Sequence, residues 1–173
     1  MSDLSTRRIP LRELDVMLDL IEAHQEIHSE KLYAVIAFGD ILSDDYSYDI
    51  DLLEVVKDWE GPRSATFASS EQLPLRGTLR LYFLKPEEFE DPNSIQEETL
   101  RNWTKTLLKT VQQAHDILFS RTPKYVENSL SLSKALAFDR PPDFNKPTIK
   151  DPFKLLSDSF AKQGKKVEDN VLR

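Results

Sequence analysis

The sequence contains no cysteine, which excludes disulfide frameworks, thiolate nucleophiles, Cys-ligated zinc and iron–sulfur clusters. Only three histidines are present, so a histidine-rich metal site is not expected. The chain also lacks the run of about 18 consecutive apolar residues that a membrane-spanning helix requires. Its first ten residues lack the apolar core of a secretory signal. We therefore expect a cytoplasmic protein that does not enter a membrane.

Positive charge is missing from one long stretch of the chain. Between Leu32 and Val56 there is no Lys or Arg, while six residues are acidic: Asp40, Asp44, Asp45, Asp49, Asp51 and Glu54. The whole chain carries a formal net charge of −7, so this stretch holds most of the excess. An acidic chain is a poor general binder of phosphate backbones, and nucleic acid is not an expected partner. The local concentration of acids instead indicates a site.

The hydrophobic residues that are present predict strands of a small sheet. The run LYAVIAF, 32–38, has no polar interruption and is typical of a strand buried on both faces. Further strands are expected over 49–56 and 78–84, and a fourth near 64–70 would form a hairpin with 78–84. A Gly-Pro turn at 61–62 separates the second strand from this hairpin.

Helices are predicted on both sides of these strands in the sequence. Apolar residues recur at helical spacing over 10–29, with Pro10 in the first turn. A capping box of Ser94 and Glu97 predicts a long helix whose apolar face extends to Leu118. Another helix is expected to start at Tyr125 and to end near residue 138.

Together these elements predict an α/β (α+β) fold in which helices flank a small mixed sheet. The expected core spans 1–92, and 93–138 forms a C-terminal helical part of the same domain. The remaining segment, 139–173, is rich in proline and lysine and is expected to be a flexible tail.

Paired carboxylates are the most informative chemical feature. Residues i and i+2 of a strand point to the same side, so Asp49 and Asp51 are expected to project together at the start of the second strand. Two adjacent carboxylates repel each other unless a cation lies between them, and Mg²⁺ prefers oxygen ligands. Gly39 ends the preceding strand, where a backbone without a side chain can approach a phosphate closely. These residues predict a Mg²⁺ and phosphate site.

The segment FGDILSDDYSYDIDLLEVV, 38–56, resembles the signature of the nucleotidyltransferase superfamily that includes DNA polymerase β and the minimal and antibiotic nucleotidyltransferases. The resemblance covers about 19 residues directly, and the order of elements extends it over about 10–90. It implies that Gly39 and Asp40 lie where an NTP binds and that Asp49 and Asp51 hold Mg²⁺. In this family a third carboxylate, from a later strand, completes the metal site.

The sequence departs from that pattern at two positions that matter for chemistry. Asp40 stands where the family has serine, and an ionised carboxylate cannot donate a hydrogen bond to a phosphate. The strand expected to carry the third carboxylate, 78–84, contains no acid and has Arg80 near that position. The leading hypothesis is Mg²⁺-dependent transfer of a nucleoside monophosphate from an NTP to a hydroxyl group. The alternative is a catalytically degenerate pseudoenzyme that binds or regulates a protein partner.

Simpler interpretations remain open. The Asp-x-Asp sequence could occur by chance in an unrelated α/β interaction protein, and Asp44-Asp45 is interpreted as a solvated turn. His24 and His28 are spaced i, i+4 on a helix, which is compatible with zinc, but no third ligand is evident and we interpret them as a surface pair. Lys162, Lys165 and Lys166 are expected to belong to a solvated tail.

Overall fold

The structure is a computed structural model that describes residues 11–43, 48–71 and 74–130. The predicted tail over 139–173 and its lysines lie outside these residues, as does the Asp44-Asp45 turn.

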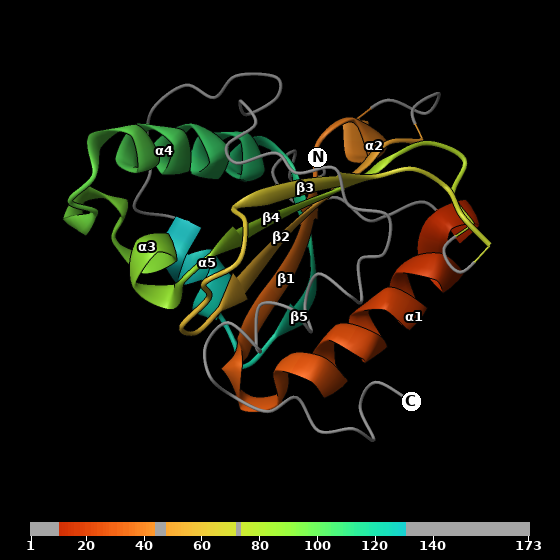
Figure 1. Cartoon of the computed structure of the whole chain (residues 1–173), viewed down its shortest axis with the longest axis horizontal. Helices are drawn as coiled ribbons and strands as arrows, with labels where there is room; N and C mark the ends of the chain where they lie inside the picture. The colour runs from red at the N-terminus through yellow and green to blue at the C-terminus, as the bar shows by residue number, and fades with distance from the viewer. Residues whose placement is uncertain (1–10, 44–47, 72–73, 131–173) are drawn as a thin grey trace.

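A mixed sheet of five strands forms the centre of the molecule (Figure 1). The strands are β1 (Leu32–Phe38), β2 (Ile50–Val56), β3 (Ser64–Phe67), β4 (Leu79–Leu84) and β5 (His115–Ser120), in the order β3-β4-β2-β1-β5. Only β2 and β4 run parallel, whereas the other neighbouring pairs are antiparallel. The expected α/β fold with a mixed sheet is confirmed, and so is the β3–β4 hairpin.

Helices cover both faces of this sheet (Figure 1). The long helices are α1 (Leu11–His28) and α4 (Glu98–Gln113), and the shorter ones are α2 (Asp40–Ser43), α3 (Pro86–Glu90) and α5 (Tyr125–Leu130). Short 3₁₀ turns follow α1 at Ser29–Lys31 and precede α4 at Pro92–Ser94. We call the two sides of the sheet the α1 face and the α4 face, after the helix that covers each.

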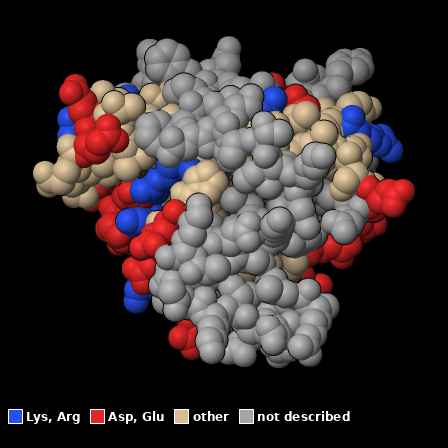
Figure 2. Space-filling model, in the orientation of Figure 1, with Lys and Arg blue, Asp and Glu red and all other residues tan. Residues whose placement is uncertain are grey.

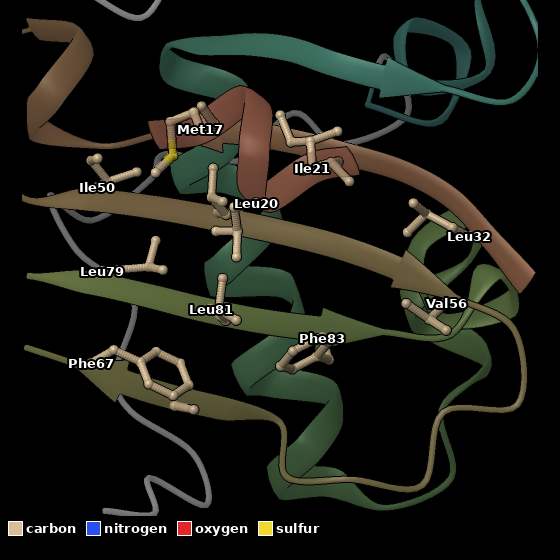
Figure 3. Packing of buried hydrophobic residues seen from close by; sticks show 14 of the residues in the cluster. Met17, Leu20, Ile21, Leu32, Ile50, Val56, Phe67, Leu79, Leu81 and Phe83 are labelled. Atoms are coloured by element: carbon tan, nitrogen blue, oxygen red, sulfur yellow. The ribbon is translucent and has the colours of Figure 1, made fainter. Parts of the chain in front are cut away.

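The core on the α1 face is made by the buried stripe of one helix and by alternate residues of the strands. Figure 3 shows Met17, Leu20 and Ile21 of α1 above side chains of β2 and β4. The opposite face buries a second cluster that includes Tyr82 and Trp103. Because helices pack on both faces, β1 and β2 are buried almost throughout, as their continuous apolar sequences predict.

The helix predicted from Ser94 to Leu118 is wrong at both ends. Glu97, rather than Ser94, caps α4, because its side chain accepts hydrogen bonds from the backbone N–H groups of Thr99 and Leu100. The helix ends when Ala114 adopts an extended backbone, with φ −156° and ψ 129°. The next six residues form β5, which pairs with β1. The segment expected to be wholly helical therefore contributes His115–Ser120 as an edge strand of the sheet.

Local sequence could not distinguish a continuation of α4 from a strand over 115–120. The apolar residues of HDILFS continue the helical spacing of α4, yet they also suit a strand. Without β5, the backbone N–H and C=O groups along the far side of β1 would lack their ladder partners. Pairing with β1 therefore decides the conformation, and that pairing joins segments about 80 residues apart in the sequence.

In the parts of the chain that the structure describes, none of the helices has the length and apolar character needed to cross a membrane. On the molecular face seen in Figure 2, Lys and Arg side chains lie among groups of Asp and Glu.

Candidate functional site

The predicted site residues lie at one end of the sheet, where β2 starts and β1 ends. Phe38 of β1 is opposite Asp51 of β2, and Asp51 is opposite Arg80 of β4. This row continues to His115 on β5 at one edge. Residues directly opposite each other in a sheet share a face, so the Asp51 and Arg80 side chains both belong to the α4 face.

Gly39 forms the turn between β1 and α2, and its backbone is in the left-handed region with φ +85°. A Cβ at this position would lie 2.6 Å from Oδ2 of Asp51. Leu42 closes the turn by donating its backbone N–H to the Gly39 carbonyl oxygen at 3.1 Å. Glycine is therefore required for two reasons: the positive φ and the close approach of a carboxylate.

Asp49 is held at the entrance to β2 by the residues that precede β4. Its Oδ1 accepts hydrogen bonds from the backbone N–H of Thr78 at 3.0 Å and from the Thr78 hydroxyl at 3.1 Å. The Ile50 N–H donates to the Thr78 carbonyl oxygen at 2.8 Å. A Cβ on Gly77 would lie 2.6 Å from Asp49 Oδ1 and 2.6 Å from the Tyr48 carbonyl oxygen, so this position also requires glycine. These contacts fix where the parallel pairing of β2 and β4 begins.

The guanidinium of Arg80 lies against both carboxylates. Its Nη2 is 3.7 Å from Oδ2 of Asp49, and its Nη1 is 3.6 Å from Oδ1 of Asp51. Asp51 is only 2% exposed, whereas the Asp49 side chain is 35% exposed. Asp49 and Asp51 therefore share one side, as predicted, and a protein cation already faces them. The observed distances are longer than a direct N–H···O hydrogen bond of about 2.9 Å, so this is a charge contact.

Asp40 is the first residue of α2, directly after the Gly39 turn, and it is partly exposed. An ionised carboxylate here adds a third negative charge close to the turn. It would repel a triphosphate and could not donate to a phosphate oxygen.

The side chains at this site differ from the ligand set that Mg²⁺ takes. A hard divalent cation takes carboxylate or carbonyl oxygens and keeps several waters. Here the two carboxylates face a guanidinium, and the register partner of Asp51 is an arginine rather than the third acid. Among the described residues, no group of three or more His, Asp or Glu side chains is arranged to hold a metal ion. As they stand, these residues do not fit the three-carboxylate site that the resemblance implies.

Several residues around the site were not singled out from the sequence. Gly77 and Thr78 position Asp49, and the Arg76 guanidinium lies 5.4 Å from the centre of the exposed Tyr48 ring. The only sequence indication was the Arg-Gly-Thr turn before a strand, and that turn alone does not reveal which carboxylate it contacts.

The interpretation of His24 and His28 as a surface pair is wrong. Both rings are buried, at 0% and 2% exposure, on the sheet-facing side of α1. Both face Glu54 of β2, which is also fully buried. The helical spacing placed the two rings on one face correctly. It did not reveal that this face packs on a carboxylate.

Comparison with known proteins adds no relative: no protein-family model matches the chain, and no curated protein matches it significantly. The resemblance to the nucleotidyltransferase superfamily therefore remains a prediction that depends on the residues of the 38–56 segment and on the order of elements around it.

Proposed function

We propose that this chain is a nucleotidyltransferase-like protein that acts as a binding or regulatory subunit and does not perform Mg²⁺-dependent transfer. One observation carries the proposal: Arg80 occupies the register position opposite Asp51 and places its guanidinium against both carboxylates of the Asp-x-Asp sequence.

The arrangement of elements supports the first half of the proposal. A helix, a buried strand, a glycine turn and an Asp-x-Asp sequence at the start of the next strand follow one another in the chain. Gly39 packs against Asp51, so the turn and the paired carboxylates form one local structure. A chance Asp-x-Asp in an unrelated interaction protein would not require this contact.

Charge supports the second half. Bringing a divalent cation between Asp49 and Asp51 would place it beside the Arg80 guanidinium, and like charges repel strongly at such short separations. Arg80 already neutralises part of the negative charge that would attract the metal. Asp40 opposes triphosphate binding at the adjacent turn. Transfer depends on electrostatic stabilisation of the phosphoryl group. Here the Arg80 cation opposes the metal ion, and the Asp40 carboxylate opposes the triphosphate.

A second candidate function, the transfer reaction itself, is favoured by one specific observation. Asp49 remains partly exposed, and the charge contacts of Arg80 at 3.6 and 3.7 Å are not direct hydrogen bonds. Movement of the arginine would present two carboxylates beside a glycine turn. In this case the protein would bind an NTP and Mg²⁺ and would transfer the nucleotide to a hydroxyl acceptor.

Labelled NTPs and Mg²⁺ distinguish the two functions. The full chain is incubated with each NTP, and label transfer, NTP turnover and the NTP-dependent change in melting temperature are measured. We expect no transfer, no turnover and no thermal shift. Turnover that disappears in both Asp49→Asn and Asp51→Asn would overturn the proposal in favour of the enzyme.

A gain-of-function variant tests the role assigned to Arg80. Arg80→Asp supplies the missing third carboxylate, and we expect it to bind Mn²⁺ more tightly than the wild type does, as measured by electron paramagnetic resonance. Arg76→Asp is the matched control, since it adds the same charge beside Tyr48 but not between the carboxylates. Equal Mn²⁺ binding by the wild type and Arg80→Asp would contradict the proposal. If Arg80→Asp does not fold, Arg80→Gln, which removes only the cation, gives the same comparison.

A further inference from the structure

A buried cluster of ionisable side chains lies between α1 and the sheet, away from the Asp49–Asp51 site. The buried stripe of α1 begins with Met17, Leu20 and Ile21, which pack on apolar strand residues (Figure 3). The same stripe continues one and two turns later with His24 and His28. Apolar residues dock the first half of the helix, and imidazole rings dock the second half.

Glu54 of β2 is the carboxylate that both rings face. Its Oε2 lies 2.6 Å from Nδ1 of His24, and its Oε1 lies 3.9 Å from Nε2 of His28. The side chains of all three residues are 0% exposed. Glu54 points to the α1 face, whereas Asp51, three residues earlier on the same strand, points to the α4 face.

Aromatic rings enclose the cluster. The two imidazoles meet edge to face with their centres 6.1 Å apart, and the His28 ring meets Trp59 in the same way at 5.9 Å. Trp59 in turn stacks on Phe83 of β4 at 4.0 Å. The second half of α1 therefore packs on the Glu54 carboxylate, and the rest of the layer between α1 and the sheet is apolar.

The stability of such a cluster depends on how many protons its side chains carry. A neutral imidazole carries one N–H, so each ring can offer a donor to Glu54 without adding charge. Protonation of a further ring nitrogen adds a positive charge inside the protein, where solvation by water is lost. Protonation of both rings would place two imidazolium cations on either side of one carboxylate, where they repel each other.

We propose that His24, His28 and Glu54 form a pH-sensitive buried cluster that holds α1 on the sheet at neutral pH and weakens in mildly acidic solution. This cluster is independent of the function proposed for the Asp49–Asp51 site, because the two lie on opposite faces of the sheet.

The direction of the response follows from His28. Burial, and then the nearby His24, hold the pKa of His28 well below its ordinary value of 6.5. The C-terminal end of a helix normally favours a protonated histidine, so desolvation outweighs the helix dipole here. In the unfolded chain His28 takes up a proton near pH 6.5, while in the folded protein it does not. The free energy of unfolding therefore falls as the pH drops from about 6.5 towards the lowered pKa, and this term is constant above about 6.5.

The acidic side chains of α1 at Asp15, Asp19, Glu22 and Glu26 are exposed, away from the buried cluster. Arg121, after β5, donates to the Ser29 carbonyl oxygen directly after α1 at 3.2 Å. On the α1 face, β5 contributes Asp116, which is opposite Ala37 of β1. Lys31, after α1, and Asp58, after β2, pair with each other at 4.0 Å and are more exposed. The other residues that the strands place in this core are apolar. Glu54 is thus the carboxylate in direct reach of both imidazoles.

Because the whole chain has three histidines, the contribution of each one to the pH dependence can be tested separately. Melting temperatures of the full chain are measured at pH 7.5 and pH 5.0 for the wild type, His28→Leu and His115→Gln. His115 is also buried, but it lies on β5 and contacts the Val111 carbonyl oxygen, so it is the matched control. We expect the acid-induced drop in melting temperature to be smaller in His28→Leu than in both the wild type and His115→Gln. An equal drop in all three proteins would overturn the proposal.

Two measurements on the wild type keep the test decisive if His28→Leu does not fold. In an NMR titration of the three imidazoles, His28 should titrate well below pH 6.5, and an apparent pKa at or above 6.5 would contradict the proposal. In hydrogen exchange corrected for the intrinsic rate, α1 amides should lose more protection between pH 7.5 and pH 5.0 than α4 amides. Parallel loss in both helices would also overturn the proposal.

Discussion

Arg80 and Asp51 are direct register partners on neighbouring parallel strands, and Nη1 of the arginine lies 3.6 Å from Oδ1 of the aspartate. Near the strand position where the resemblance leads us to expect a third acid, the chain thus carries the opposite charge. Because Asp51 is buried, this cation matters for stability as well as for chemistry.

Arg80→Met should destabilise the protein, because it leaves the Asp51 carboxylate buried without its cation. Removing one partner of a buried ion pair typically costs about 3 kcal/mol, and the free energy of unfolding in urea measures the loss. Arg76→Met, which removes an exposed arginine near the same site, should change stability by less than about 0.5 kcal/mol. Equal effects of the two variants would show that the Arg80 contacts contribute nothing specific.

Gly39→Ala should lower stability by about 2 kcal/mol or more, since a residue with a Cβ is strained at φ +85° and the Cβ would meet Asp51. Gly61→Ala is the control, because Gly61 does not have a positive φ. Chemical denaturation gives both values. If Gly39→Ala is as stable as the wild type, the turn does not have the conformation described.

Glu88→Ala should cost about 2–3 kcal/mol, because one buried carboxylate serves three donors. Both terminal nitrogens of Arg63 donate to it, and its Oε1 also accepts the backbone N–H of Lys85 at the start of α3. Glu87→Ala removes an exposed acid from the same helix and should have almost no effect. Since the Arg63–Glu88 pair is largely buried, the difference between the variants should persist at high salt. A difference that vanishes in 1 M salt would argue for a surface pair instead.

Leu20→Ala and Leu18→Ala test how α1 docks. Leu20 is fully buried against the sheet, so truncation should cost about 3 kcal/mol through lost apolar contacts and a cavity. Leu18, on the same helix, is 53% exposed, and its truncation should change stability by less than about 0.5 kcal/mol. Urea unfolding separates the two outcomes. Similar losses would mean that the outer face of α1 is also covered.

Much of the fold could be predicted because its elements have strong local patterns. The apolar run of β1 was located at its observed bounds, and α1 and β2 differ from prediction by about one residue at an end. β5 could not be predicted, because its residues suit either a helix or a strand. The choice depends on pairing with β1, a distant segment.

The candidate site was predictable in part for the same reason. The i, i+2 spacing placed Asp49 and Asp51 on one side, and both reach the same guanidinium. That guanidinium could not be assigned from spacing, because its position depends on the parallel register of β2 and β4. Glu54 was likewise overlooked, since a charged residue in a strand buried on both faces finds its partners on another element.

By itself, therefore, the sequence determined the short-range facts about this protein: which residues form α1, β1 and β2, where a glycine turn occurs, and which side Asp49 and Asp51 share. Backbone periodicity sets these, and it acts over a few residues. The tertiary structure alone decided that the Arg80 guanidinium faces both paired carboxylates and that His24 and His28 face Glu54. Charges from distant segments meet only when the chain packs, and burial then determines the strength of their interaction.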